Sequence, residues 1–262
     1  MATVPPSSAE RHPLRLFLRQ LELHSKLGAE AKDAVLALPF HTVAVEAGNY
    51  ILREDDTPVA CAVLVDGFAY RQKETVTGKR QIVSLHNPGE ALDLQQLALV
   101  TADHSLRMLT DGEVAYIDHK HLQRLMTAHS DLAEAIFRAT LIEASIFREW
   151  VLNVGRRDAR TRIAHLLCEF AMRLDRSGLT RPEGYLLPMS QEQLADTTGL
   201  TTVHINRILK VLAAEGLIVR KVRGIAFESW TRLKEIGGFD GRYLHIDHQT
   251  PRARERGARE SA

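Results

Sequence analysis

A glycine between two helical stretches is the feature that most constrains how this chain folds. In the segment QEQLADTTGLTTVHINRILK, Ser190 precedes the first stretch and can cap a helix that runs through Thr197. Gly199 supplies the positive φ that a sharp turn requires, and Thr201 can cap a second helix. The spacing therefore predicts two short helices joined by a tight turn.

The apolar side chains of this segment suit two helices packed at an angle. Small Ala195 lies where such helices would approach each other closely. The residues expected to pack the pair together are Leu194, Leu200, Ile205 and Ile208. A helix-turn-helix places its second helix in the major groove of DNA, so the pattern predicts a DNA-binding module. An ordinary pair of antiparallel helices is the alternative.

The residues after the second helix predict a basic hairpin. In LIVRKVRGIAFES, apolar Ile218 and Val219 lead into a basic tip that contains Arg223 next to Gly224. A basic hairpin beside a helix-turn-helix is typical of a winged module, whose wing lies along phosphates. The expected DNA-contacting residues are Ser190, Gln191, Thr201, Thr202, Val203, His204, Asn206, Arg207, Lys210 and Arg223.

The first half of the chain has a different character. From His41 to about Asp118, short stretches rich in Val, Ile, Leu and Tyr alternate with turn signals such as Asp66–Gly67 and Pro88–Gly89. Such spacing predicts an antiparallel β-sandwich or jelly roll. The preceding residues, 14–38, carry helical spacing that is broken near Gly28.

A long helix is expected from Asp131 to Asn153, where apolar residues recur at spacings of 3 and 4. They form two neighbouring stripes: Leu132, Ile136, Ala139, Ile146 and Trp150, and Phe137, Leu141, Ala144 and Val151. One stripe would dock on the β-region and the other on a partner helix, unless both are buried within one monomer. Gly155 is expected to interrupt this helix as a hinge before the next amphipathic helix.

Composition limits the class of protein. A chain of 262 residues suits two domains, and no apolar run approaches the ~18 residues of a membrane span. No secretory signal begins the chain, so a cytoplasmic protein is expected, without a membrane partner. Its two cysteines have no CxxC spacing, and neither a metal site nor a cofactor is predicted.

Charge is distributed unevenly along the chain. Residues 1–155 contain 15 Lys and Arg against 20 Asp and Glu, whereas residues 156–262 contain 19 against 13. Because Lys and Arg neutralise phosphates, a basic second half is consistent with a DNA-binding domain joined to a regulatory domain.

These segments together resemble the Crp/Fnr family of bacterial transcription regulators over about residues 14–235. The resemblance is strongest in LADTTGLTTVHINRILKVLAAEGLI and SIFREWVLNVGRRDARTRIAHLLCEFAMRL, with weaker support from VLVDGFAYRQ and HNPGEALDLQ. It implies an α+β chain that binds a double-stranded DNA operator as a homodimer, with RNA polymerase as a further partner if the chain is an activator. The implied parts are a β-barrel or jelly-roll sensor domain (14–130), a dimerisation helix and hinge (131–155), a winged helix-turn-helix (156–237) and a C-terminal tail (238–262), which we expect to be mobile.

The resemblance also assigns roles on the second helix of the motif. The family's base-reading arginine matches Arg207, which can donate two hydrogen bonds to guanine O6 and N7. Val203 stands where family members often carry an acidic residue, which favours an apolar contact such as a thymine methyl group. Asn206 would read adenine or contact a phosphate, whereas Ser190, Thr201 and His204 would contact phosphates.

The sensor half departs from the family's cyclic-nucleotide site. Asp93–Leu94 replaces the Gly–Glu pair that holds the ribose, and His104–Ser105 replaces the Arg–Ser pair that holds the phosphate. Since neutral histidine is a poor substitute for a bidentate arginine, we expect no response to cyclic AMP. The cysteine cluster of the iron–sulfur members does not occur. Residues that would instead meet a neutral or cationic ligand are Glu90, Asp93, Gln95, Gln96, His104 and Ser105.

Three other functions remain open from the sequence. The regulator is controlled by an unidentified small ligand or by haem in the barrel, or the chain is an interaction protein that no longer binds DNA. A more remote alternative is a cupin-type metalloenzyme, which needs clustered ligands within the strands. The HxH pair, His119 and His121, instead falls where the β-region ends. We therefore expect a protein that is not an enzyme.

Overall fold

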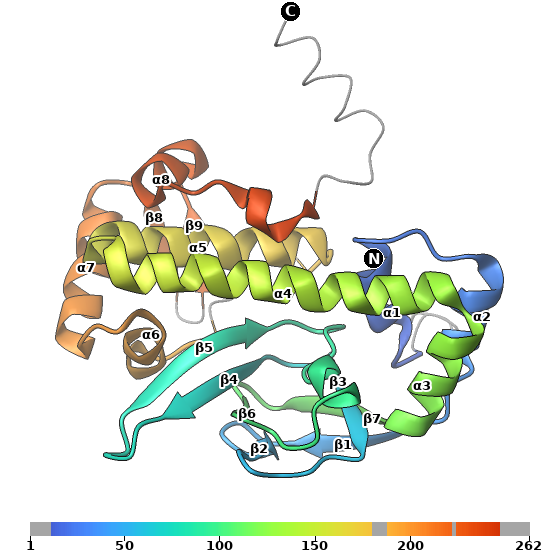
Figure 1. Ribbon diagram of the computed structural model, residues 1–262. Helices are drawn as coiled ribbons and strands as arrows, with labels where there is room; N and C mark the ends of the chain where they lie inside the picture. Colours follow the sequence, from blue (N-terminus) through green and yellow to red (C-terminus); the bar gives the residue numbers. More distant parts are fainter. Residues whose placement is uncertain (1–11, 180–187, 222–223, 247–262) are drawn as a thin grey trace, which may run out of the picture. The chain divides into compact units, whose positions relative to one another are not determined.

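The computed structural model describes residues 12–179, 188–221 and 224–246. These residues form two compact units (Figure 1). The first combines the described chain up to Ala69 with His86–Leu141, and the second combines Tyr70–Leu85 with the described chain from Ile142 onward. Two strands that lie early in the sequence therefore belong to the same unit as the predicted DNA-binding module.

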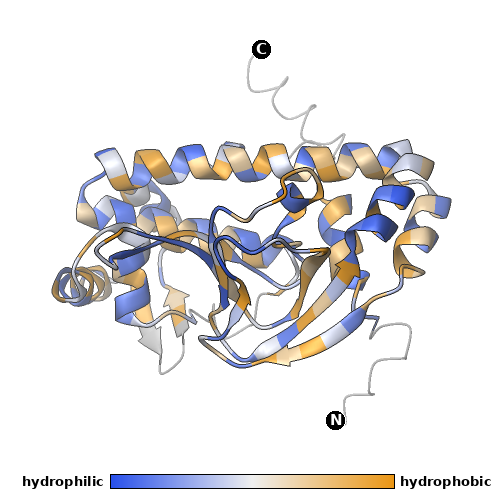
Figure 2. Cartoon of the chain, turned by 60° about the horizontal axis from the view of Figure 1, so that its bottom comes forward, coloured by the Kyte–Doolittle hydropathy of each residue, from blue (hydrophilic) through white to orange (hydrophobic). Residues whose placement is uncertain are grey.

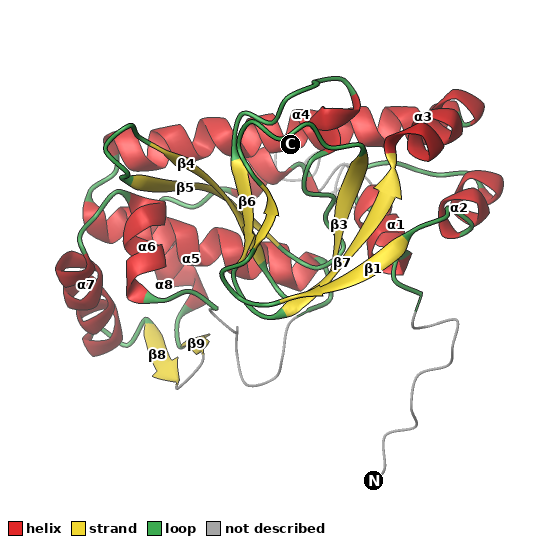
Figure 3. Ribbon diagram, turned by 90° about the horizontal axis from the view of Figure 1, so that it is seen from below, coloured by secondary structure: helices red, strands yellow, loops and turns green. Residues whose placement is uncertain are grey.

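In the described part of the chain, the expected β-region forms two sheets and not one closed barrel (Figure 3). One sheet has the order β1-β7-β3 and the other has the order β2-β6-β4-β5. Their strands are β1 (His41–Val45), β2 (Tyr50–Leu52), β3 (Ala60–Asp66), β4 (Ala69–Glu74), β5 (Arg80–His86), β6 (Ser105–Met108) and β7 (Gly112–Asp118). The mixed fold class expected from the sequence is confirmed, with the turn signals lying between the strands.

Helices cover the core of the first unit. Helices α1 (Arg15–Glu22) and α2 (Ala29–Leu36) lie on either side of Gly28, as the broken helical spacing predicted. With α3 (His119–Ala128), they contribute to one apolar cluster that also contains β3 side chains. Its largest buried members include Leu14, Phe17, Ile117, Leu122 and Leu132. Among the described residues, no helix has both the length and the apolar character needed to cross a membrane.

The long helix α4 runs from Ser130 to Arg156. Figure 2 shows apolar residues along its whole length. Leu132, Ile136 and Trp150 from the first predicted stripe are buried. Three members of the second stripe are exposed instead: Phe137, Leu141 and Val151, joined by Leu152. The helix therefore leaves an apolar stripe uncovered in the monomer.

Gly155 does not interrupt the chain as the sequence predicted. It lies in the last turn of α4, and the break comes after Arg156. Asp158 then begins α5 (Ala159–Arg176), because its carboxylate accepts hydrogen bonds from the backbone N–H groups of Arg160 and Thr161. These hydrogen bonds, above all that from Thr161, hold the pKa of Asp158 below its usual value. The cap, rather than the glycine, determines where the two helices meet.

The second unit contains the predicted helix-turn-helix and wing. Its further elements are α6 (Gln191–Thr198), α7 (Thr202–Ala214), β8 (Ile218–Lys221), β9 (Gly224–Phe227) and α8 (Trp230–Gly237), with β8 and β9 forming a two-stranded antiparallel sheet. Helix α5 supplies the centre of the unit, where Ile163, Leu167 and Phe170 are buried with Leu212 and Leu233.

The first part of the predicted tail is ordered, contrary to the expectation of a mobile segment from residue 238. Phe239 and Leu244 are buried, and a short 3-10 helix, η3, spans Gly241–Leu244. Helix α8 ends close against α5, since a Cβ atom on Gly237 would lie 2.8 Å from the backbone nitrogen of His165. The segment stays folded because its apolar side chains pack in this unit. Residues 247–262 lie outside the described chain.

Candidate DNA-binding interface

The first helix of the motif begins with two reciprocal hydrogen bonds. The Ser190 hydroxyl accepts from the Gln193 backbone N–H at 3.1 Å, and the Gln193 side-chain oxygen accepts from the Ser190 N–H at 2.8 Å. This capping box satisfies two N–H groups at a helix end. Because a hydroxyl both accepts and donates, Ser190 retains the ability to donate a hydrogen bond to a phosphate oxygen.

The turn between the two helices has the conformation that the glycine predicted. Gly199 has φ 65° and ψ 30°, in the left-handed region that disfavours other residues. Thr201 then caps α7, since its hydroxyl accepts from the His204 backbone N–H at 3.3 Å. The chain thus turns within three residues and starts a second helix in a new direction.

Helix α7 has one buried face and one exposed face. Ile205, Leu209 and Leu212 point into the domain and are buried. On the other face, the side chain of Val203 is 75% exposed, and Arg207 and Lys210 are also exposed. The monomer therefore leaves an apolar side chain and two cations of this face in contact with solvent. The exposed face is therefore suited to a partner outside the chain.

The structure brings most of the predicted DNA-contacting residues to this one region. Ser190, Thr201, Thr202 and His204 are exposed, whereas Gln191 and Asn206 are half-buried. All but Asn206, which follows in the second turn of α7, lie at the N-termini of α6 and α7, where backbone N–H groups favour anions. The predicted wing contact Arg223 lies outside the described residues.

Arg162 on α5 connects the turn to the end of the long helix, and sequence reasoning missed it. Its guanidinium donates to the carbonyl oxygens of Thr198 at 2.6 Å, Arg157 at 2.9 Å and Asn153 at 3.1 Å. Carbonyls at helix ends have no partner within the helix, so one arginine satisfies three of them from α4 and α6. The motif is thereby held against the end of α4.

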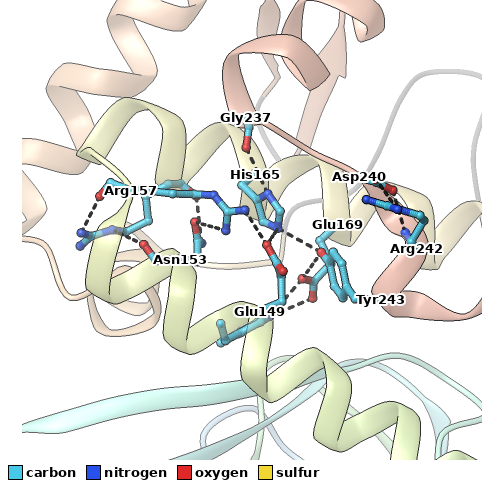
Figure 4. A network of polar contacts seen from close by, with 11 residues as sticks. Glu149, Asn153, Arg157, His165, Glu169, Gly237, Asp240, Arg242 and Tyr243 are labelled. Atoms are coloured by element: carbon cyan, nitrogen blue, oxygen red, sulfur yellow. Dashed lines mark hydrogen bonds and ion pairs between the residues drawn. The ribbon is translucent and has the colours of Figure 1, made fainter.

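A polar network lies beside this junction (Figure 4). Glu169 is 1% exposed, and its carboxylate accepts hydrogen bonds from the indole N–H of Trp150 at 3.0 Å and the hydroxyl of Tyr243 at 2.7 Å. Burial raises the pKa of Glu169, and the buried hydroxyl of Tyr243 beside it also has a raised pKa. The network joins α4 and α5 to the segment that follows α8.

His165 is the second buried group of this network. Its Nδ1–H donates to the Gly237 carbonyl, with 3.1 Å between the atoms. Its Nε2 lies 3.1 Å from the Tyr243 oxygen and 3.5 Å from a carboxylate oxygen of Glu149. Burial, aided by the positive charge of Arg157, lowers the pKa of His165 to about 4. The imidazole is therefore neutral near neutral pH.

Most of the predicted ligand-contacting residues of the sensor half make polar contacts within the protein. The carboxylate of Asp93 is buried and accepts from the Ala62 backbone N–H at 2.9 Å. His104 lies 2.6 Å from Asp103 and 3.4 Å from Gln95.

The remaining three candidates differ in their surroundings. Glu90 lies 3.3 Å from His86, and the Ser105 hydroxyl accepts from the Glu54 backbone N–H at 3.0 Å. Gln96 is buried, and its amide has no hydrogen-bond partner among the described residues. The structure thus pairs His104 with Gln95 and gives Asp93 and Ser105 local structural contacts.

Comparison with known proteins follows the same division. Residues 42–129 match the cyclic nucleotide-binding domain, and residues 161–236 match the Crp-like helix-turn-helix domain. The transcriptional activator protein FnrL of Cereibacter sphaeroides is 28% identical over 199 residues, which cover 74% of this chain and 79% of that protein. The nitrogen fixation regulation protein FixK of Azorhizobium caulinodans is 26% identical over 219 residues, covering 81% and 86%.

A solved structure shares the fold. FixK2 from Bradyrhizobium japonicum superposes with a TM-score of 0.71 at 23% sequence identity, over 78% of this chain and 100% of that one. The two domain matches occur in the order expected from the sequence. The chain belongs to the Crp/Fnr family of transcription regulators.

Proposed function

We propose that this regulator binds a two-fold symmetric DNA operator as a homodimer, with one α7 helix in the major groove of each half-site. The observation that carries the proposal is the exposed face of α7, where Val203, Arg207 and Lys210 project from a helix whose other face is fully packed. The left-handed Gly199 ends α6 and the Thr201 cap begins this helix, so its exposed face is set by the turn. Recognition helices of this motif read bases with their first turns.

Each side chain of the interface has a proposed role. Arg207 donates to guanine O6 and N7, Val203 packs on a thymine methyl group, and Asn206 reads adenine or contacts a phosphate. The remaining residues contact phosphates: Ser190, Gln191, Thr201, Thr202, His204, Lys210 and Arg223. The bases supply specificity, whereas the phosphates supply affinity that falls with salt.

The exposed stripe of α4 is the proposed dimer contact. Phe137, Leu141 and Val151 follow one another at helical spacings, and their side chains are 62%, 52% and 74% exposed. If the same helix of a second copy covered these side chains, the apolar surface removed from water would stabilise the dimer. Regulators of this family act as dimers, and two copies would present two α7 helices to two half-sites.

We infer that the sensor half does not use cyclic AMP. Leu94 is buried and has no group for a ribose hydroxyl, and Asp93 already holds the Ala62 N–H. Among the described residues, no cluster of three or more His, Cys, Asp or Glu side chains is arranged to hold a metal ion. We propose a regulatory role, with RNA polymerase as a partner if the protein activates transcription.

Selection from random double-stranded DNA tests this function. Purified protein should enrich a two-fold symmetric motif whose half-sites lie about 10 base pairs apart, one helical turn. A matched control is Arg242→Ala, because Arg242 is an exposed arginine of the same unit that lies outside the motif. The control should enrich the same motif. Recovery of unrelated sequences by the wild type would contradict sequence-specific binding.

A further inference from the structure

The hairpin formed by β4 and β5 is held against the first helix of the DNA-binding motif. Although it precedes that motif by more than a hundred residues, it belongs to the same compact unit. Figures 1 and 3 both place β5 beside α6. The two strands are joined by a turn in which the Thr75 N–H donates to the Lys79 carbonyl at 2.9 Å.

Arg80 at the start of β5 forms an ion pair with α6. Its Nε lies 2.7 Å and its Nη2 lies 2.5 Å from the same carboxylate oxygen of Asp196. Both side chains are only 22% exposed, so solvent screens this pair less than it would a surface pair. Nη2 also lies 3.7 Å from Glu192, one turn earlier on α6. The positive charge of Arg80 therefore lies beside the negative charges of two carboxylates on this helix.

The neighbouring residue Gln81 holds the end of the same helix. Its side-chain N–H donates to the Thr197 carbonyl at 3.1 Å. The next carbonyl, that of Thr198, accepts from Arg162. Since the last carbonyls of a helix lack partners within it, β5 and α5 together satisfy the last two carbonyls of α6, directly before the Gly199 turn.

The other end of the hairpin is also attached to helices of this unit. Arg173 on α5 donates to the Leu85 carbonyl at 2.7 Å. Arg71 on β4 lies 2.6 Å from the Glu143 carboxylate on α4, and its side chain is almost fully buried. The hairpin is thus fixed along its length, so the position of Arg80 and Gln81 is defined by α4 and α5 as well as by the strands.

These contacts leave the proposed reading face open. Val203, Arg207 and Lys210 on α7 remain exposed while Arg80 is paired with Asp196. Helices α6 and α7 share buried side chains, so a displacement of α6 would displace α7 with it. Neutralising Asp196 and Glu192 also lowers the negative charge of a helix whose N-terminus is proposed to face phosphates. Both effects favour DNA binding.

We propose that Arg80 and Gln81 are positioning residues for operator binding, and that the β4–β5 hairpin holds α6 in its DNA-binding position. The inference rests on the proposed function, since it requires an operator. Strand β5 continues directly into residues 87–105, where the candidate ligand residues lie. A change in the conformation of residues 87–105 would therefore alter the position of β5, and with it the contacts of Arg80 and Gln81 to α6.

A charge exchange between Arg80 and Asp196 tests the proposal. Arg80→Gln should weaken affinity for the wild-type-selected operator about tenfold, since a charge-assisted contact that positions α6 is lost. The double variant Arg80→Asp with Asp196→Arg should recover most of that affinity. Arg242→Gln, which breaks an exposed Arg–Asp pair in the same unit, is the matched control and should bind as the wild type does. Fluorescence anisotropy measures all four proteins, with melting curves and dimer mass to establish folding.

The salt dependence of binding separates positioning from a phosphate contact. Because Arg80 would not touch DNA, the slope of log affinity against log salt should be the same for Arg80→Gln and the wild type. If Arg80→Gln lowers the melting temperature, Gln81→Ala provides the second test, with an expected loss of about threefold. Wild-type affinity in folded Arg80→Gln and Gln81→Ala, tighter binding, or no recovery in the exchanged pair would overturn the proposal. If the wild-type protein selected no operator from random DNA, the result would instead contradict the proposed function.

Discussion

The hydroxyl of Tyr243 donates to the buried carboxylate of Glu169 at 2.7 Å and thereby ties the segment after α8 to helix α5. Trp150 on α4 donates to the same carboxylate, so three parts of the second unit meet at one charged group. A buried carboxylate depends strongly on such donors, because each replaces hydration that the carboxylate loses.

Tyr243→Phe should lower the free energy of unfolding by about 1–3 kcal/mol, because it leaves Glu169 with one hydrogen-bond donor fewer at a buried site. Urea denaturation at fixed protein concentration measures the change. Tyr50→Phe is the control, since Tyr50 interacts through its ring with Arg53 and Arg107. Equal stability of Tyr243→Phe and the wild type would mean that the hydroxyl contributes nothing to this junction.

His165 should make stability depend on pH in the acidic range. Its pKa is about 4 in the folded protein against an ordinary value of 6.5, so between these values the unfolded chain binds a proton that the folded chain does not. The free energy of unfolding contributed by His165 is therefore complete above 6.5 and is lost as the pH falls toward 4.

His165→Asn isolates this contribution, because an amide can still donate to the Gly237 carbonyl but does not titrate. The stability advantage of the wild type over the variant should shrink by up to about 3 kcal/mol as the pH falls from about 7 to about 4. Glu149 and Arg157 lie beside His165, and Glu169 lies beyond Tyr243, in both proteins, so their own contributions cancel in the difference. A difference that does not change with pH would contradict the buried neutral histidine.

A charge in the exposed stripe of α4 should dissociate the dimer. Val151→Glu and Leu141→Glu would each place two carboxylates against apolar surface in the dimer, at a cost of several kcal/mol. Light scattering should show the monomer mass for both variants. Lys120→Glu, on an exposed part of α3, should keep the wild-type mass. An intact dimer in both stripe variants would exclude this face as the contact.

Cyclic AMP and cyclic GMP should neither bind nor alter operator affinity, because we propose that Asp93, Leu94 and His104 stand where related proteins hold the ribose and phosphate. A ligand shifts a conformational equilibrium only through contacts that differ between the two states. Calorimetry of the purified dimer, together with operator binding with and without each nucleotide, measures the effect. Micromolar binding that also tightens operator affinity would show that other residues hold the nucleotide.

Local sequence signals predicted most of the fold and the two helices of the helix-turn-helix. Ser190, Gly199 and Thr201 act on neighbouring residues, so their roles as caps and turn are legible from spacing alone. The apolar alternation that predicted strands also needs only local pattern. Gly155 was misread because its permissiveness does not by itself end a helix, whereas the Asp158 cap starts the next one.

Contacts between distant residues were not predictable in this way. Arg80 and Asp196 are 116 positions apart, and nothing near either residue in the sequence indicates the other. Arg162 likewise donates to carbonyls of α4 and α6, and these come within reach of one side chain only once the chain has folded. The segment from Gly238 to Ile246 is ordered through contacts with residues distant in the sequence. Tyr243 contacts His165 and Glu169 of α5, and Phe239 and Leu244 are buried, so no local pattern predicts its order.

Base preference at the operator tests the central claim most directly. Operators carrying each single base-pair change should be measured against the wild type, Arg207→Ala and Arg242→Ala by competition binding. The wild type and Arg242→Ala should lose about 1–3 kcal/mol when one guanine per half-site is replaced, and Arg207→Ala should bind all four bases there equally while keeping its other preferences. An Arg207→Ala profile identical to that of the wild type would contradict the assignment of α7 as the helix that reads the operator.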